Sequence, residues 1–187
     1  MMPTFRTSQP GSAVDPSKPH LILVGLPGSG KTTVGQAVAA KLGRSFLDLD
    51  QEIERREGRS IGQIFGEKGE AYFRKKEREL TEELTFVGNM IVAPGGGWVT
   101  DAENVAIVRP PSQLVYLRVT PESALKRLGP MRMMRPLLSR PDPLGELKRL
   151  LETRRAAYES ADHTVSTELY DLQRVIDKVV ALAGSWV

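Results

Sequence analysis

Short apolar runs alternate with longer amphipathic segments along most of the chain. Each run has the length of a buried strand, and each segment between two runs is long enough for a helix. Strands that alternate with helices are typical of a parallel sheet covered on both faces, so the pattern predicts a three-layer α/β domain. The predicted strands are residues 20–24, 45–47, 90–93, 113–119 and 163–165.

Three helix starts are marked by residues that are typical of a helix N-cap or first turn. Ser60 and Thr100 are each followed three residues later by Gln or Glu, which is the spacing of a capping box. Pro121 follows Thr120, and proline suits the first turn because its missing N–H is not needed there. We therefore expect helices to begin after Ser60, Thr100 and Thr120.

Length and composition narrow the class of protein. The 187 residues fit one domain, and 40% hydrophobic with 26% charged residues is ordinary for a globular protein. No apolar run approaches the roughly 20 residues of a membrane helix. The absence of Cys excludes disulfides and Cys nucleophiles and favours a cytoplasmic location. A net charge of +3 is too small to indicate nucleic-acid binding unless the basic residues cluster.

The first residues differ from the rest. Residues 1–19 are rich in Pro, Ser and Thr and lack hydrophobic periodicity, so we expect a disordered tail before a domain at residues 20–187. The tail lacks the apolar core of a signal peptide. Arg6 and Lys18 outnumber Asp15, as in a transit peptide, but the stretch has no amphipathic pattern, which favours a plain tail.

The strongest chemical motif is the sequence GLPGSGKT at residues 25–32. A buried strand precedes it and a helical pattern follows it, which favours a P-loop over a chance glycine-rich turn. Successive backbone N–H groups and the helix N-terminus would stabilise a phosphate. Lys31 would place positive charge against the β- and γ-phosphates of ATP, and the Thr32 hydroxyl suits Mg²⁺. The expected phosphate-binding residues are Gly28, Ser29, Gly30, Lys31, Thr32 and Thr33.

Asp48 and Asp50 are the only carboxylates at the end of a predicted strand. P-loop enzymes usually hold Mg²⁺ with an Asp from such a position. In an extended strand end, residues two apart face the same side, so both would point toward the phosphates. One would serve the Mg²⁺ shell and the other the acceptor hydroxyl. Alternatively, Asp50 alone is the N-cap of a helix starting near Gln51, which leaves Asp48 unexplained.

Three further features indicate the acceptor. The glycines at residues 95–97 directly follow a strand, where bare backbone can approach a ligand. Arg74 is followed three residues later by Glu77, which can orient it across a helix turn, and Arg154 lies in a late helix. Arginine is the preferred partner of a carboxylate because its planar fork makes two hydrogen bonds. Each arginine taken singly also fits a solvated surface position.

Residues 129–143 contain four prolines and three arginines. Prolines at that density exclude a continuous helix, and a long connection in a compact domain is usually either functional or disordered. A loop that holds three arginines fits a mobile lid, at about residues 129–143, that closes over the phosphates.

These motifs, in this order, resemble the shikimate kinases, and the resemblance runs from about Leu21 through Thr167. The elements that carry it are Gly28-Ser29-Gly30-Lys31-Thr32-Thr33, Asp48-Leu49-Asp50, Gly58-Arg59-Ser60-Ile61, Phe73-Arg74 with Glu77, Gly95-Gly96-Gly97, Arg135-Pro136-Leu137-Leu138, and Arg154 four residues before Tyr158. The resemblance implies a P-loop kinase fold like that of nucleoside-monophosphate kinases, with a five-stranded parallel sheet, helices on both sides and a mobile lid. It also implies transfer of the γ-phosphoryl group of ATP to the 3-hydroxyl of shikimate in aromatic amino-acid biosynthesis.

The resemblance further implies residue roles. Asp50 would bind the ring hydroxyls and accept the proton, Arg127 would lie against the adenine, and Arg135 would reach the ATP phosphates. Mg²⁺ would be bound directly by Thr32 and through water by Asp48. The implied catalytic residues are Lys31, Asp50 and Arg135, and the implied shikimate-binding residues are Asp50, Arg74, Gly95, Gly96, Gly97 and Arg154.

Some positions depart from the family pattern. The lid is slightly longer, Ala156-Ala157 replaces a common Pro-Leu, and Arg155 adjoins Arg154, so the arginine register admits a shift of one. No adenine-facing residue is assigned after Thr167.

Two other functions are weighed against this one. A gluconate or nucleotide kinase shares the fold, and gluconate also carries a carboxylate. A non-catalytic ligand sensor would be free to lose its catalytic residues, but Lys31, Asp48, Asp50 and Arg135 are all present. A sensor paired with a DNA-binding segment would need room for a helix-turn-helix, and the 20 residues before the first strand are too few for one. The expected partners are ATP or ADP and shikimate, without nucleic acid or membrane, for a cytoplasmic monomer.

Overall fold

The structure is a computed structural model that describes residues 18–130, 138 and 141–184. The predicted tail up to residue 17 and most of the predicted lid, with Arg132, Arg135 and Arg140, lie outside the described residues. All five predicted strands are present: β1 (Leu21–Val24), β2 (Phe46–Asp48), β3 (Ile91–Ala93), β4 (Gln113–Arg118) and β5 (His163–Ser166). The α-helices are α1 (Lys31–Leu42), α2 (Leu49–Glu57), α3 (Ile61–Glu83), α4 (Ala102–Val108), α5 (Pro121–Leu128), α6 (Pro143–Glu159) and α7 (Leu172–Gly184), with short 3-10 helices η1 (Leu84–Phe86) and η2 (Trp98–Thr100).

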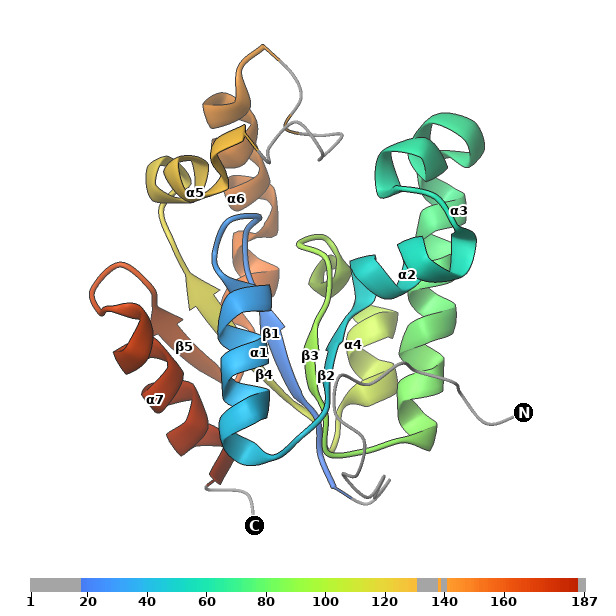
Figure 1. Ribbon diagram of the computed structural model, residues 1–187. Helices are drawn as coiled ribbons and strands as arrows, with labels where there is room; N and C mark the ends of the chain where they lie inside the picture. Colours follow the sequence, from blue (N-terminus) through green and yellow to red (C-terminus); the bar gives the residue numbers. More distant parts are fainter. Residues whose placement is uncertain (1–17, 131–137, 139–140, 185–187) are drawn as a thin grey trace.

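The strands form one parallel sheet in the order β2-β3-β1-β4-β5 (Figure 1). Leu21 at the start of β1 is paired with Ile91 of β3 on one side and with Gln113 of β4 on the other. Because every pair is parallel, the carboxyl ends of all five strands meet at the same edge. Ligands bind outside this edge in open α/β sheets.

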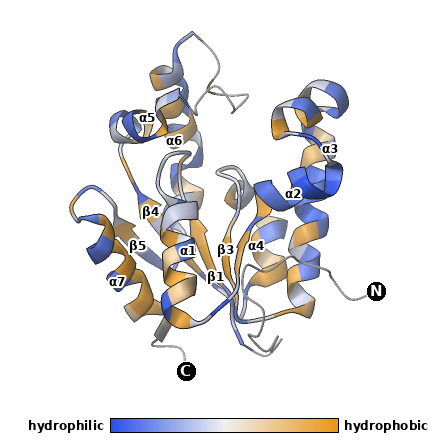
Figure 2. Cartoon of the chain, in the orientation of Figure 1, coloured by the Kyte–Doolittle hydropathy of each residue, from blue (hydrophilic) through white to orange (hydrophobic). Residues whose placement is uncertain are grey.

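Two apolar layers cover the sheet, as the alternation of side chains in β1 requires. Leu21 and Leu23 pack with α1 and α7 on one face. Ile22 and Val24 pack with α3, α4, α5 and α6 on the other face. Figure 2 shows the apolar colour along the strands, whereas α2 is mostly hydrophilic. The three-layer prediction is therefore confirmed.

Two of the three predicted helix caps are confirmed. Ser60 makes a full capping box at the start of α3, and Thr120 caps α5. The cap of α4 is Asp101, not Thr100 as predicted. Thr100 closes η2 and donates its hydroxyl to Gly97 O at 2.6 Å, so the extended backbone that a cap needs occurs one residue later. Among the described helices, none has the length and apolarity needed to cross a membrane.

His20 fastens the opposite edge of the sheet, where the strands begin. Its ring is buried, and Nδ1 accepts a hydrogen bond from Met90 N–H at 3.3 Å. Nδ1 is therefore unprotonated, and Nε2–H donates to Leu84 O at 3.0 Å. Burial lowers the pKa of His20, and the nearby charge of Arg44 lowers it further, against the opposing effect of the carbonyls of Leu84 and Val87.

This environment predicts acid sensitivity of the fold. A His pKa that is lower in the folded than in the unfolded state gives stability that is present above about pH 6.5 and is lost as pH falls through the folded value. Between pH 7.5 and 5.5 this loss is at most about 1.4 kcal/mol for one histidine. We expect His20→Gln to have a smaller drop in unfolding free energy over that range than the wild type, measured by urea denaturation. His163→Gln changes the chain's other histidine, and an equally reduced drop in that control would contradict the assignment to His20.

Candidate active site

The loop between β1 and α1 is shaped to surround an anion. Gly25 has φ 148° and Gly28 has φ 83°, and a Cβ at either position would lie within 2.7 Å of the backbone oxygen of Leu117 or Ala124. No L side chain fits there without moving backbone. Gly30 is the N-cap of α1 and contributes no side-chain hydrogen bond, so the first N–H groups of the helix are left for a ligand.

Lys31 and Thr32 begin α1 and face this loop. Lys31 Nζ donates to Gly25 O at 2.8 Å and to Leu26 O at 3.0 Å, so its ammonium group is held at the phosphate loop. Thr32 Oγ1 donates to Asp48 Oδ2 at 2.8 Å, which places the two residues predicted to serve Mg²⁺ side by side.

The two aspartates come together by a different geometry from the predicted one. β2 ends at Asp48, whose Oδ1 accepts the Gln51 N–H at 3.2 Å and caps α2, and Asp50 lies in the first turn of that helix. The prediction of an extended pair is therefore wrong, and so is the alternative in which Asp50 is the cap. The physical reason is that Asp48 keeps extended dihedral angles while its carboxylate satisfies a free N–H group of the helix. Both carboxylates nevertheless line one cavity.

This cavity, which we call the central cavity, has a volume of about 630 Å³ and opens at the carboxyl edge of the sheet. It brings together residues from the phosphate loop, α2, α3, α6 and the segment after β3. The predicted site residues that line it are Gly28, Gly30, Lys31, Thr32, Thr33, Asp48, Asp50, Arg74, Gly95, Gly96, Gly97, Arg127 and Arg154. Of the predicted site residues that the structure describes, only Ser29 lies elsewhere, in a neighbouring cavity.

Arg74 enters the central cavity from α3 and is oriented by two carboxylates. Its Nη1 donates to Glu77 Oε2 at 2.8 Å and its Nη2 donates to Glu70 Oε1 at 3.1 Å. Glu77 is fully buried, and this burial raises its pKa to about 7 although the charge of Arg74 acts in the opposite direction. The negative charge of Asp50 raises the pKa of Glu77 further. The predicted orienting contact between Arg74 and Glu77 is therefore present.

Arg154 enters the same cavity from α6, whereas its neighbour Arg155 is exposed. One turn later Tyr158 is buried, and its hydroxyl donates to Gly96 O at 2.7 Å. Burial raises the pKa of Tyr158 to about 12, so it remains a neutral donor. This contact anchors α6 to the segment after β3. In the structure it is therefore Arg154, and not Arg155, that lines the cavity.

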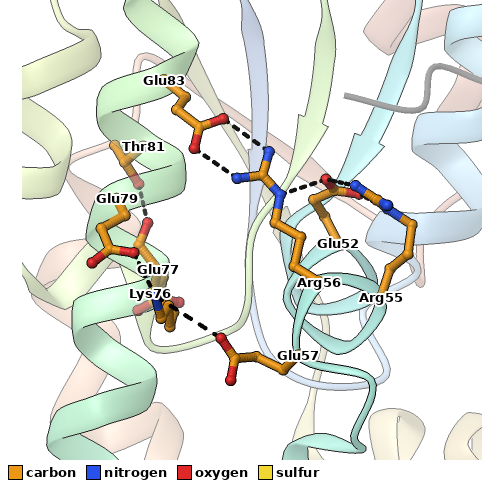
Figure 3. A network of polar contacts seen from close by, with 9 residues as sticks. All are labelled: Glu52, Arg55, Arg56, Glu57, Lys76, Glu77, Glu79, Thr81 and Glu83. Atoms are coloured by element: carbon orange, nitrogen blue, oxygen red, sulfur yellow. Dashed lines mark hydrogen bonds and ion pairs between the residues drawn. The ribbon is translucent and has the colours of Figure 1, made fainter. Parts of the chain in front are cut away.

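Ion pairs hold α2 against α3 (Figure 3). Glu52 is buried and accepts hydrogen bonds from Arg55 at 2.7 and 2.8 Å and from Arg56 at 2.8 Å. Arg56 also makes a two-fold contact with Glu83 of α3, at 2.6 and 2.8 Å. Most of α2 is hydrophilic (Figure 2), and its apolar anchors are Leu49 and Ile53, which are buried in the core shared with α3. Because α2 carries Asp50 and α3 carries Arg74, the network sets the spacing of these two groups.

A smaller cavity of about 420 Å³ continues from the phosphate loop toward α7. Arg127 lines both cavities, and Thr167 holds its guanidinium group by two hydrogen bonds, from Nη1 to Oγ1 at 2.8 Å and from Nη2 to the backbone oxygen at 2.7 Å. Beyond Thr167, Tyr170 and Leu172 complete the wall of the smaller cavity, at positions for which the sequence predicts no adenine-facing residue. No motif signals them: Tyr170 lies in the irregular connection after β5, and Leu172 is the first residue of α7.

Comparison with known proteins decides the family. A family model described as shikimate kinase matches residues 27–183. The chain belongs to the shikimate kinase family. A shikimate kinase from Symbiobacterium thermophilum is 39% identical over 163 residues, which cover 86% of this chain and 94% of that relative.

The solved structures give the same family. A shikimate kinase from Acinetobacter baumannii, solved in complex with shikimate, superposes with a TM-score of 0.84 at 38% identity and covers 90% of this chain and 94% of its own. A gluconokinase from Sinorhizobium meliloti superposes with a TM-score of 0.58 at 17% identity, which indicates the shared fold alone. The predicted family and P-loop kinase fold are confirmed, and this member of the shikimate kinase family is a phosphotransferase with an alcohol group as acceptor.

Proposed function

We propose that the central cavity performs the family reaction, transfer of the γ-phosphoryl group of ATP to the 3-hydroxyl of shikimate. The observation that carries this proposal is the convergence of Asp50 from α2, Arg74 from α3 and Arg154 from α6 on one cavity beside the phosphate loop. An acceptor held by these three side chains lies next to the phosphates that the loop binds.

The two arginines suit the carboxylate of shikimate. A guanidinium group binds a carboxylate through two parallel hydrogen bonds, and such a pair is strong where water is excluded. Arg74 is 31% exposed in its side chain and already oriented by Glu77, so little ordering is needed when the ligand arrives. The segment containing Gly95, Gly96 and Gly97 forms the wall between the two arginines and completes the binding site.

Asp50 is the group proposed to accept the proton. The 3-hydroxyl oxygen attacks the γ-phosphorus, its proton passes to the Asp50 carboxylate, and the bond from the γ-phosphorus to the β–γ bridging oxygen breaks. ADP leaves with the electron pair of that bond, and the product is shikimate 3-phosphate. Lys31 and the N–H groups of the phosphate loop stabilise the charge that develops on the phosphates.

Mg²⁺ fits the pair of Thr32 and Asp48. Both present hard oxygen atoms, 2.8 Å apart, at the phosphate loop. Within the described residues no group of three or more acidic or His side chains is placed to hold a metal, which suits an ion held mainly by phosphates and water. When bound, Mg²⁺ neutralises charge on the β- and γ-phosphates. Thr32 would bind it directly and Asp48 through water.

The smaller cavity is proposed to take the adenine, with Arg127 against the ring and Ser29 in the wall near the phosphates. The role of Arg135 on the ATP phosphates lies outside the described residues and stays a prediction. The monomeric state, the cytoplasmic location, the absence of nucleic-acid and membrane partners, and the tail before residue 20 also stay predictions.

A panel of acceptors tests the function directly. With ATP and Mg²⁺, we expect ADP release in a coupled assay with shikimate, and no comparable release with gluconate or a nucleoside monophosphate. Removal of Mg²⁺ with EDTA should abolish the signal, since the phosphate charge is then uncompensated. Turnover of gluconate with a kcat/KM close to that of shikimate would refute the acceptor assignment.

Asp50→Asn tests the proton acceptor. The amide keeps the size of the side chain but cannot take the proton, so kcat should fall by about 10²- to 10⁴-fold. Binding of ATP, followed by calorimetry, should remain, because Lys31 and the N–H groups of the phosphate loop, which are proposed to hold the phosphates, are unchanged. A variant with nearly wild-type kcat would show that Asp50 is not the acceptor.

Arg74→Ala and Arg154→Ala test the carboxylate site. Removing one partner of a desolvated charge pair costs about 2–5 kcal/mol, so the KM for shikimate should rise at least about tenfold while the KM for ATP changes little. Arg155→Ala is the matched control, because this neighbour is exposed and outside the cavity. Equal effects on both substrates would point to a general loss of structure, and a large effect of Arg155→Ala would refute the register.

A further inference from the structure

Helix α3 is broken at Gly69, where the backbone has φ 81° and ψ 170° (Figure 1). This conformation lies far from the helical one and favours glycine. A change of φ or ψ at this one residue turns the front stretch of α3, residues 61–68, against the rear stretch, residues 70–83. Contacts between the two stretches are therefore needed to fix the angle between them.

Both stretches of α3 form the wall of the central cavity. Ile61 and Phe65 line the cavity from the front stretch, and Phe73 and Arg74 line it from the rear stretch. The rings of Phe65 and Phe73 pack across the break with their centroids 5.0 Å apart. The angle at Gly69 therefore sets how the apolar front wall lies relative to Arg74, which is proposed to bind the acceptor.

Glu57 joins the two stretches from outside the cavity. This last residue of α2 accepts hydrogen bonds at Oε2 from Lys68 Nζ of the front stretch at 2.9 Å and from the Tyr72 hydroxyl of the rear stretch at 3.0 Å. Lys68 Nζ also donates to the Tyr72 hydroxyl at 3.0 Å and lies 4.2 Å from the centroid of its ring. Each of the three side chains thus contacts the other two.

The position of Glu57 is unfavourable for α2 itself. A carboxylate in the last turn lies at the negative end of the helix dipole. The side chain of Glu57 is also only 13% exposed, so its charge is largely withdrawn from water. The hydrogen bond from Lys68, together with that from Tyr72, lowers the pKa of Glu57 and keeps the group charged. The contacts with α3 therefore offset what the helix dipole costs.

We propose that Glu57, Lys68 and Tyr72 are positioning residues for the acceptor pocket. They hold the front stretch of α3 at a fixed angle to the rear stretch and so set the place of Ile61 and Phe65 relative to Arg74. None of the three positioning residues lines the central cavity, so their effect on the acceptor passes through the residues that do. The inference rests on the proposed function of the central cavity.

Shikimate affinity tests the role of the three residues. We expect Glu57→Gln and Tyr72→Phe each to weaken shikimate binding by about 3- to 30-fold in calorimetry. The affinity for ATP should stay within about twofold, because the phosphate loop is unchanged. Glu67→Gln is the matched control: it makes the same substitution and removes the ion pair with Arg59, but both partners of that pair precede Gly69.

Variants of Lys68 and a double-mutant cycle test whether the three side chains act as one unit. Lys68→Met should weaken shikimate binding as Glu57→Gln does, whereas Lys68→Arg keeps the charge and should bind within about twofold of the wild type. If Glu57 and Tyr72 act together, the double variant should be at most about twofold weaker than the weaker-binding single variant. Multiplication of the two single factors would contradict a common role.

A distance measurement reports the angle at Gly69 without any ligand. The chain has no Cys, so Gly66→Cys on the front stretch and Glu82→Cys on the rear stretch can each carry a spin label at an exposed position. We expect a narrow distribution of label distances in pulsed electron paramagnetic resonance. Adding Glu57→Gln should shift or broaden this distribution, and adding Glu67→Gln should not.

The two measurements together decide the inference. Shikimate affinity within twofold of the wild type in Glu57→Gln would overturn it, and so would an unaltered distance distribution. Equal losses of shikimate and ATP affinity would overturn it as well, since they indicate a general loss of structure. Tyr72→Phe removes only a hydroxyl group and replaces Glu57→Gln in both measurements should that variant not fold. A wild type that binds no shikimate would refute the proposed function, and the positioning role in the acceptor pocket falls with it.

Discussion

Parallel pairing of the five strands is the constraint on which the rest of the molecule depends. Because the strands run in one direction, the segments that follow β1, β2 and β3 all leave the sheet at one edge. These segments carry the phosphate loop after β1, Asp50 at the start of α2 after β2, and the glycines at residues 95–97 after β3, while Asp48 is the last residue of β2 itself. Groups that are 16 residues apart along the chain, such as Thr32 and Asp48, or 71 residues apart, such as Gly25 and Gly96, thereby become neighbours.

Charge accumulates at this edge and has to be balanced within the protein. Glu77 is buried beside Arg74, and its raised pKa reflects how little water reaches it. The same carboxylate orients the guanidinium group of Arg74. A buried ion pair adds little net stability because both charges lose water, so the role of the Arg74–Glu77 pair is orientation. Further out, the ion pair of Arg56 with Glu83 joins α2 to α3, and Glu52 holds Arg56 within α2. Ionic contacts thus hold the two helices that carry opposing charges of the site.

Glycine lets the backbone lie close to neighbouring groups at this edge in two different ways. In the phosphate loop, Gly25 and Gly28 have dihedral angles that L residues avoid and lie against backbone oxygen atoms. After β3, the backbone is ordinary and the neighbours are the ends of functional side chains. The first arrangement is required for the loop to form at all. In the second, a Cβ would meet the side chain of Asp50, Arg154 or Arg74.

The sequence by itself determined the features that follow from local pattern. Five strands, the phosphate loop and the caps at Ser60 and Thr120 were all predicted, because strand hydrophobicity and capping chemistry act between residues near in sequence. The ordered motifs also sufficed for the family. The predictions were wrong where two nearby residues could each be the helix N-cap, as with Asp48 and Asp50 or Thr100 and Asp101. Which of the two is the cap depends on backbone dihedral angles that the sequence pattern does not show.

Only the tertiary structure decided which residues meet. Arg154 and Arg155 are equivalent in a sequence pattern, and the packing of α6 through Tyr158 places one in the cavity and the other in solvent. Tyr170, in the irregular connection after β5, and Leu172, the first residue of α7, line the smaller cavity, and no motif in the sequence signals either. The partners of Gly95, Gly96 and Gly97 lie on three separate helices. Such contacts depend on how helices pack across a sheet, and that packing is set by the whole core, not by any local run of residues.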